Sequence, residues 1–332
     1  MTSTSRRALA ALSAVPVGLA AASAIYQRLA ERRDTRRFPP PGELVDVGGR
    51  RLHVFRSGTG KPVVIVVPAL STPADEWVRV QRCLADVTDA TTIVVDRAGI
   101  GWSDPGPWPR TISAMADEVD VLVHALGIDG PVVLAGHSVG GLIARLYAAR
   151  HRDRVARLIL VDSSHEDQNK RLHEVDPSIG DIELAMRAAG WCLRVLGWKR
   201  LKLALGLAPD LRRDAETEVP ADLVDAHLAT HLSSRNRRAV VQEFTGVLTG
   251  REALRDEARD LGDMPVTVVT AGPVRRENWY PVWCELQAEF LTMSTNATHI
   301  WARHSSHHIN HDDPGLLARV IGDAVREVGA AR

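Results

Sequence analysis

The sequence predicts an α/β protein with a mostly parallel sheet and helices on both of its faces. Three observations support this fold class: short apolar runs alternate with amphipathic helical segments, a Gly-x-Ser-x-Gly pattern joins a strand to a helix, and a long helical block interrupts the alternation. The chain has 332 residues, of which 45% are hydrophobic, which is enough for one large domain with an insertion.

Composition narrows the classes of function. Lys plus Arg and Asp plus Glu both number 41, and the isoelectric point is near 7.2, so no net field favours a nucleic-acid partner or an acidic substrate. The cysteines Cys83, Cys192 and Cys284 are odd in number and far apart, without metal-ligand spacing. We therefore expect no disulfide framework and no nucleic-acid partner, and the oligomeric state stays open.

Residues 1–37 are predicted to lie outside the core. Arg6 and Arg7 precede a nearly uncharged stretch over residues 8–27 that is rich in Ala, Leu and Val. This length is enough to cross a bilayer as a helix, whereas the Ala22-Ser23-Ala24 motif is typical of a signal cleavage site. We expect a transmembrane helix and membrane association, with export after cleavage as the alternative. The arginines that follow favour a cytoplasmic C-terminal domain if the anchor is uncleaved, but the sidedness stays open.

The first part of the core is predicted over residues 38–162, after a stiff Pro-rich linker at 38–42. Strands at Leu44–Val47 and Leu52–Phe55 join through Gly48-Gly49, which predicts a hairpin at the antiparallel edge of the sheet. Buried strands are predicted from continuous apolar runs at 63–67, 92–96, 132–135 and 155–161. Helical patterns cover residues 74–86 and 113–126.

Residues 163–262 contain helical patterns and no convincing strand. The helices are predicted at 181–196, 221–232, 235–248 and 251–260. Because this block is too long for a loop, we interpret it as a helical cap over the site, inserted before the last two strands. Four apolar residues are candidates for lining a substrate pocket, although cap–core packing explains each of them as well: Trp191, Trp198, Leu201 and Leu205.

The second part of the core is predicted over residues 263–332. Strands are expected at 266–270 and 298–302, with a helix near 281–292 between them and a final helix from Pro314. The alternation of strands and helices thus resumes after the cap, as a mostly parallel sheet requires.

The pattern Gly136-His137-Ser138-Val139-Gly140 lies between an apolar strand and a helix-forming run. Such a strand–turn–helix junction forces the serine into a strained backbone conformation and exposes its hydroxyl. Gly136 and Gly140 leave room where strand and helix nearly touch. The Val139 amide lies at a helix N-terminus, where it can stabilise an oxyanion. Ser138 is therefore the predicted nucleophile, against the alternative of a structural turn serine.

A serine nucleophile needs a base, and that base needs an orienting acid. In strand–turn–helix junctions of this type, called nucleophile elbows, the chain order is Ser, acid, His. The base should therefore follow the last strand. There the sequence offers His304, His307, His308 and His311. Their spacing also allows a metal site on a continuous helix. No metal is expected, because the segment lies between a strand and a helix.

Three motifs carry a resemblance to a known family. They are Gly136–Gly141, Asp96–Asp104 and the Ser-Ser-His-x-Ile-x-x-Asp-x-Pro ending at Pro314. Over residues 43–330 the chain resembles the α/β-hydrolase fold family, in the branch that holds esterases, lipases, C–C bond hydrolases and cofactor-free haloperoxidases. The resemblance implies an α/β-hydrolase sheet and maps the catalytic histidine of the family to His307.

The position of the acid departs from the common pattern of the family. Most members carry it in a Gly-x-x-Asp pattern after the strand that corresponds to 266–270, where this chain has Arg275. Glu277 is the nearest carboxylate there. Some relatives place the acid one strand earlier, which corresponds to Asp162. Asp162 is therefore preferred and Glu277 is the alternative, although Asp162 also fits as a residue that caps a turn.

The second oxyanion donor also departs from the family, which usually has a glycine after the third strand. This chain has Pro68-Ala69-Leu70. Because proline has no N–H group, the Leu70 amide is predicted to act with that of Val139.

The nucleophile indicates the reaction. Relatives that open epoxides or remove halide use a carboxylate, so the serine argues against those activities. Ser with His supports acyl transfer to water without a cofactor, and the expected function is hydrolysis of a small carboxylic ester or related acyl substrate. The alternatives are lactone or C–C hydrolysis, cofactor-free haloperoxidase activity, and a catalytically silent binding protein with this fold.

Overall fold

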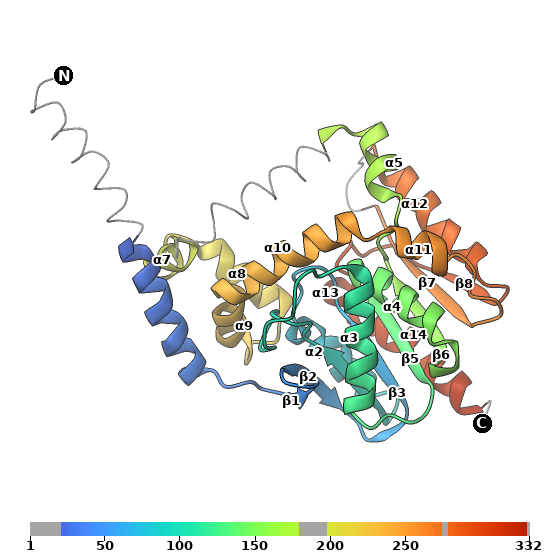
Figure 1. The fold of residues 1–332 in the computed structure, drawn as a ribbon, viewed down its shortest axis with the longest axis horizontal. Coiled ribbons are helices and arrows are strands. Elements are labelled where there is room, and N and C mark those ends of the chain that lie inside the picture. Colours follow the sequence, from blue (N-terminus) through green and yellow to red (C-terminus); the bar gives the residue numbers. More distant parts are fainter. Residues whose placement is uncertain (1–20, 179–197, 274–277, 331–332) are drawn as a thin grey trace, which may run out of the picture.

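The computed structural model describes residues 21–178, 198–273 and 278–330. Its centre is an eight-stranded sheet in the order β1-β2-β4-β3-β5-β6-β7-β8, flanked by helices (Figure 1). The strands are β1 Glu43–Asp46, β2 Arg51–Ser57, β3 Gly60–Val67, β4 Ala90–Val95, β5 Val132–His137, β6 Val155–Val161, β7 Val266–Ala271 and β8 Ala297–Ala302. Only the β1–β2 and β2–β4 pairs are antiparallel. The mostly parallel sheet and its antiparallel edge are therefore confirmed.

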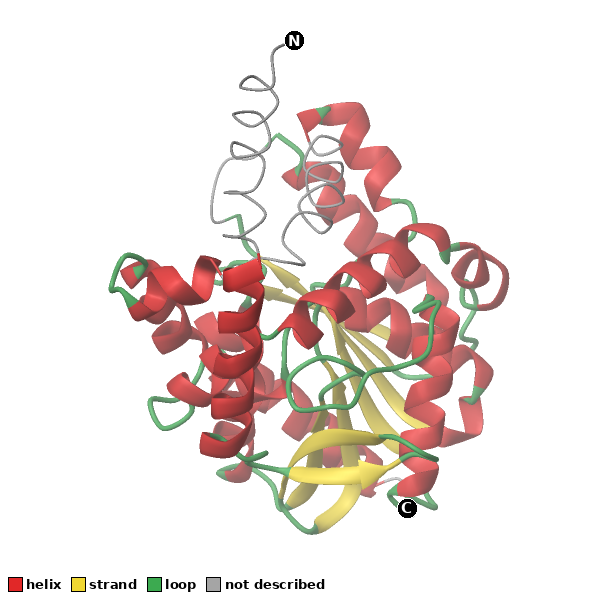
Figure 2. Ribbon diagram, turned by 60° about the vertical axis from the view of Figure 1, so that its left-hand side comes forward, coloured by secondary structure: helices red, strands yellow, loops and turns green. Residues whose placement is uncertain are grey.

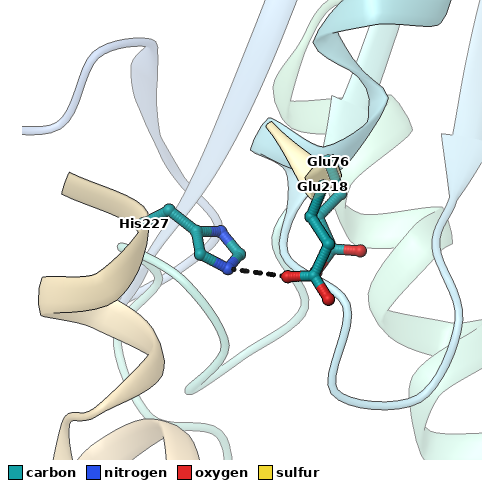
Figure 3. A group of neighbouring side chains, drawn as sticks. All are labelled: Glu76, Glu218 and His227. Atoms are coloured by element: carbon teal, nitrogen blue, oxygen red, sulfur yellow. Dashed lines mark ion pairs between the residues drawn. The ribbon is translucent and has the colours of Figure 1, made fainter. Parts of the chain in front are cut away.

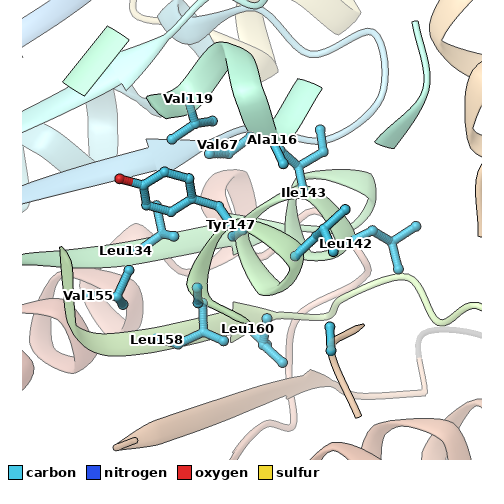
Figure 4. Close-up of a cluster of buried hydrophobic side chains, with 14 of the residues drawn as sticks. Val67, Ala116, Val119, Leu134, Leu142, Ile143, Tyr147, Val155, Leu158 and Leu160 are labelled. Carbon is cyan, nitrogen blue, oxygen red and sulfur yellow. The ribbon is translucent and has the colours of Figure 1, made fainter. Parts of the chain in front are cut away.

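Helices pack on both faces of this sheet (Figure 2). The elements of the core are η1 Ala74–Trp77, α2 Val78–Ala85, α3 Ile112–Ala125, α4 Val139–Arg150, η2 Arg152–Arg154, α12 Tyr280–Glu289, η3 Phe290–Met293, α13 Ile309–Asp312 and α14 Pro314–Ala330. Side chains of a strand alternate between the faces, so Ile65 and Val67 join the cluster around α3 and α4, shown in Figure 4. Val64 and Val66 instead face α2 and α14.

The helices between β6 and β7 form the cap. They are α5 Gln168–Val175, α7 Trp198–Ala204, α8 Pro209–Glu218, α9 Val224–His231, α10 Ser234–Thr249 and α11 Glu252–Glu257. The sequence predicts the last three, whereas the predicted helix at 181–196 lies outside the described residues. α8 escapes prediction because Ala215 is its one buried residue, which leaves no apolar periodicity to read.

Residues 21–37 form a helix that packs on the cap. The side-chain amide of Gln27 is buried and donates to the carbonyl of Leu232 at 2.8 Å. Further along the same helix, the Asp34 carboxylate forms an ion pair with Arg200 of α7. The polar side of this helix is thus tied to cap elements that lie far away in the sequence.

This helix bears on the transmembrane prediction for residues 8–27, which is wrong for the described part of the chain. No helix there is both long and apolar enough to cross a membrane. The helix that contains residues 21–27 continues to residue 37 and includes five arginines and two acidic residues beyond Gln27. The predicted apolar stretch ended at Gln27 and therefore did not take these charges into account. Residues 8–20 lie outside the described residues.

Candidate active site

Ser138 lies at the junction between β5 and α4, as the sequence predicts. Its backbone has φ 53° and ψ −121°, a region that non-glycine residues rarely adopt. The helix begins directly at Val139, so the amide of Val139 belongs to the positively polarised first turn of α4. The local chain thus presents a serine hydroxyl beside a potential oxyanion donor.

The two glycines of the motif are required by close backbone packing. A Cβ on Gly136 would lie 2.4 Å from the carbonyl oxygen of Gly140, and a Cβ on Gly140 would lie 2.0 Å from that of Val67. Both distances are far below van der Waals contact. The end of β3, the end of β5 and the start of α4 are therefore pressed together in a way that only glycine permits.

His307 and Asp162 meet at the carboxyl edge of the sheet. His307 Nδ1 lies 2.6 Å from Asp162 Oδ2. The other oxygen, Oδ1, accepts the backbone N–H of Ala271 and the indole N–H of Trp283, each at 3.0 Å. Asp162 is 2% exposed, so its carboxylate is shielded from water, whereas the His307 side chain is 39% exposed. Glu277, the alternative acid, lies outside the described residues.

His137, the histidine beside Ser138 in the strand–turn–helix junction, holds the loop that carries His307. His137 Nε2 lies 2.8 Å from the backbone carbonyl oxygen of His307. Burial, together with the nearby His307 ring, lowers the pKa of His137 well below its usual value. His137 is therefore neutral and donates its Nε2 proton to that carbonyl. His137 belongs to the Gly-x-Ser-x-Gly motif, but nothing in the sequence indicates this contact.

The turn that carries Leu70 is fixed by a buried arginine. The guanidinium of Arg97 donates to the carbonyls of Pro68 at 2.6 Å and Ala69 at 2.9 Å. Two further hydrogen bonds, both 2.8 Å long, join it to the carboxylate of Glu243 in α10. The Arg97 and Glu243 side chains are 2% and 0% exposed. One ion pair thus connects the Leu70 turn with the cap.

Sequence reasoning misses this ion pair. Arg97 belongs to the Asp96–Asp104 motif, but its partner is 146 residues away in the cap. Glu243 is an acidic residue on the buried face of an amphipathic helix, and that is the one signal that marks it as unusual.

Ser138, Asp162 and His307 line one pocket of about 440 Å³. The pocket is also lined by apolar and aromatic residues, which are Leu172 of α5, Pro273 and three residues at the start of α12: Trp279, Tyr280 and Trp283. The predicted lining differs from this set. Leu201 and Leu205 do not line this pocket, and Leu205 is 62% exposed. The side chains of Trp191 and Trp198 lie outside the described part of the chain.

Comparison with known proteins finds sequences that are similar to this chain. A family model for the alpha/beta hydrolase fold matches residues 62–189. An AB hydrolase superfamily protein from Gibberella zeae is 26% identical over 303 residues, which cover 82% of this chain and 89% of that protein. The sequence match therefore extends through the core and the cap.

Solved structures match as well. The haloalkane dehalogenase DbeA from Bradyrhizobium elkani has a TM-score of 0.65 at 18% identity and covers 87% of this chain and 99% of its own. A thermophilic esterase from Thermogutta terrifontis has a TM-score of 0.61 at 21% identity, covering 86% and 97%. Likeness at these identities concerns the fold, because one fold hosts many activities. With its sheet order, its strand–turn–helix junction and the family model that matches residues 62–189, this chain has the α/β-hydrolase fold.

Proposed function

We propose that this protein is a serine hydrolase that cleaves a carboxylic ester through an acyl-enzyme. Ser138 acts as nucleophile, His307 as general base and acid, and Asp162 as the residue that orients His307. The observation that carries the proposal is the 2.6 Å contact between His307 Nδ1 and Asp162 Oδ2, at the wall of the pocket that Ser138 also lines. Such a set of groups serves nucleophilic catalysis by serine.

The chemistry follows from the tautomer that this contact selects. A proton on Nδ1 of His307 is held by the Asp162 carboxylate, which leaves Nε2 as a free acceptor for the Ser138 proton. The serine oxygen attacks the ester carbonyl, and the negative charge on the carbonyl oxygen is stabilised by the amides of Val139 and Leu70. His307 then returns the proton to the leaving alcohol. Water, activated in the same way, releases the acid.

The pocket favours a substrate with an apolar group. Leu172, Trp279 and Trp283 line the same space of about 440 Å³ as Ser138 and His307, a size typical of small-molecule sites. Aromatic walls bind apolar chains by removing their surface from water. We therefore propose esters with a short to medium apolar acyl or alcohol part.

The test uses the purified full chain with p-nitrophenyl esters of graded acyl length and a fluorophosphonate probe. We expect ester hydrolysis and stoichiometric labelling. In Ser138→Ala, labelling disappears and turnover falls on the order of 10⁶-fold, while the circular dichroism spectrum is unchanged. Activity retained in Ser138→Ala would refute the nucleophile assignment.

Two other outcomes point to the alternative functions. A wild-type protein that neither hydrolyses esters nor reacts with the probe would be a catalytically silent member of the family. A protein that reacts with the probe but hydrolyses none of the esters would have an activated serine with another substrate, such as a lactone or a C–C bond. Because the probe reports the nucleophile alone, it separates these two cases.

A further inference from the structure

A second cluster of chemically active side chains lies between the core and the cap. It contains Glu76 of η1, Glu218 at the end of α8 and His227 of α9 (Figure 3). One ligand atom from each residue lies within 4.8 Å of the others. Among the residues that the structure describes, no other group of three His, Cys, Asp or Glu side chains converges in this way.

The imidazole of His227 is oriented at both nitrogens. Nδ1 lies 3.1 Å from Oδ1 of Asp75, a fully buried carboxylate. Nε2 lies 3.4 Å from Oε2 of Glu218. Histidines that bind metal ions usually donate the other ring N–H to a carboxylate, which fixes the tautomer. Two ligands of a tetrahedral zinc ion, each about 2.0–2.1 Å from it, are about 3.4 Å apart.

The cluster has an excess of negative charge. In the described part of the chain, the ion-pair partners of Asp75, Glu76 and Glu218 are all histidines. Asp75 Oδ2 is buried and has no hydrogen-bond partner among the described residues. Buried carboxylates require a compensating positive charge. Two protons on histidines, or one divalent cation, supply it.

We propose that Glu76, Glu218 and His227 bind a divalent cation, with Asp75 orienting His227. The donor set of one imidazole and two carboxylates suits Zn²⁺. Its remaining coordination position is taken by water or by His311, whose Nε2 lies 3.1 Å from Glu76 Oε2. The ion neutralises the two ligating carboxylates and links core segment η1 to cap helices α8 and α9. This site is separate from Ser138 and does not depend on the proposed function.

The test titrates Zn²⁺ into the chelator-treated full chain by isothermal calorimetry. We expect one ion to bind per chain. Glu218→Gln should weaken binding at least about 100-fold, and Asp75→Asn about 10–100-fold, as removal of a group that orients a metal ligand does. Glu216→Gln is the matched control, because its carboxylate is exposed on the same helix two residues earlier. It should bind like the wild type.

Other outcomes would overturn the proposal. Absence of saturable binding by the wild type would assign the cluster to protonated histidines. Equal affinities in Glu218→Gln and Glu216→Gln would place the ion elsewhere. Binding that survives Glu218→Gln but is lost in His304→Gln would place it in the C-terminal histidine segment. Circular dichroism of each variant shows that a loss of affinity is not a loss of fold.

Discussion

Replacing Asp162 with asparagine gives the sharpest test of the proposed triad. Asp162 Oδ1 accepts two N–H groups at 3.0 Å, one from the Ala271 backbone and one from the Trp283 indole. An asparagine must keep its oxygen on that side, because an NH₂ group there would face two donors. Its NH₂ group then faces His307 Nδ1. That nitrogen becomes the acceptor, and the ring proton moves to Nε2, where it blocks uptake of the Ser138 proton.

The magnitude follows from this change of tautomer. The corresponding Asp→Asn substitution in a Ser-His-Asp protease lowers turnover about 10⁴-fold, which corresponds to about 5.4 kcal/mol in the barrier. Since the two donors that orient the asparagine are buried with Asp162, we expect a loss of about the same size here. The Michaelis constant should change little, because Asp162 acts on His307 rather than on the substrate.

The assay is steady-state hydrolysis of a p-nitrophenyl ester, with thermal unfolding as a check on the fold. Asp167→Asn serves as the control, because this carboxylate pairs with Arg255 at the partly exposed start of α5. It should leave turnover unchanged, as should Glu277→Gln. An Asp162→Asn variant that keeps a tenth or more of the wild-type turnover would refute the tautomer argument. A large loss in Glu277→Gln would assign the acid to that residue instead.

Four further substitutions, two of them compared with each other, test the rest of the site. His307→Ala should lower turnover about as much as loss of the serine does, because the two residues act as one unit. His308→Ala should lower turnover only slightly. The reverse result would make His308 the catalytic histidine. Glu243→Gln removes the charge that pairs with buried Arg97 and should lower the free energy of unfolding by about 3–5 kcal/mol in urea titrations, so unchanged stability would contradict it. Gly140→Ala should abolish folding or ester hydrolysis, because its Cβ would lie 2.0 Å from the carbonyl oxygen of Val67. A fully active variant would contradict this, since the backbone would then have moved to make room for the methyl group.

Much of the sheet was readable from the sequence because its strands are buried on both faces. Runs such as Val155–Val161 have no polar alternation to confuse with a surface, and the structure places a strand with those bounds. The sequence did not predict the polar helix α8 or the charged continuation of the N-terminal helix beyond Gln27, because neither has a run of buried apolar residues. Their stability comes from contacts with other elements, which local hydropathy does not report.

In the candidate site, too, the sequence predicts some residues and not others. Ser138 and Asp162 follow strands directly, so the sequence could place them at one edge of the sheet, and the structure brings Asp162 against His307. The partners that support them could not be predicted, because Arg97 and Glu243 are 146 residues apart. The cation cluster also draws its ligands from three separate elements. Pairings of this kind exist only after the cap has docked.

The position of Asp162 before the cap divides the protein into parts that can be exchanged separately. β5, α4 and β6 form one βαβ unit with neighbouring strands, and it fixes both Ser138 and Asp162. The cap follows β6 in the sequence, after both Ser138 and Asp162. A cap from another protein could therefore change access to the pocket without altering the spacing between Ser138 and Asp162. Arg97 sets one requirement for such a transplant. Arg97 stays behind in the core with its guanidinium buried, and any incoming cap must present a carboxylate where Glu243 now lies.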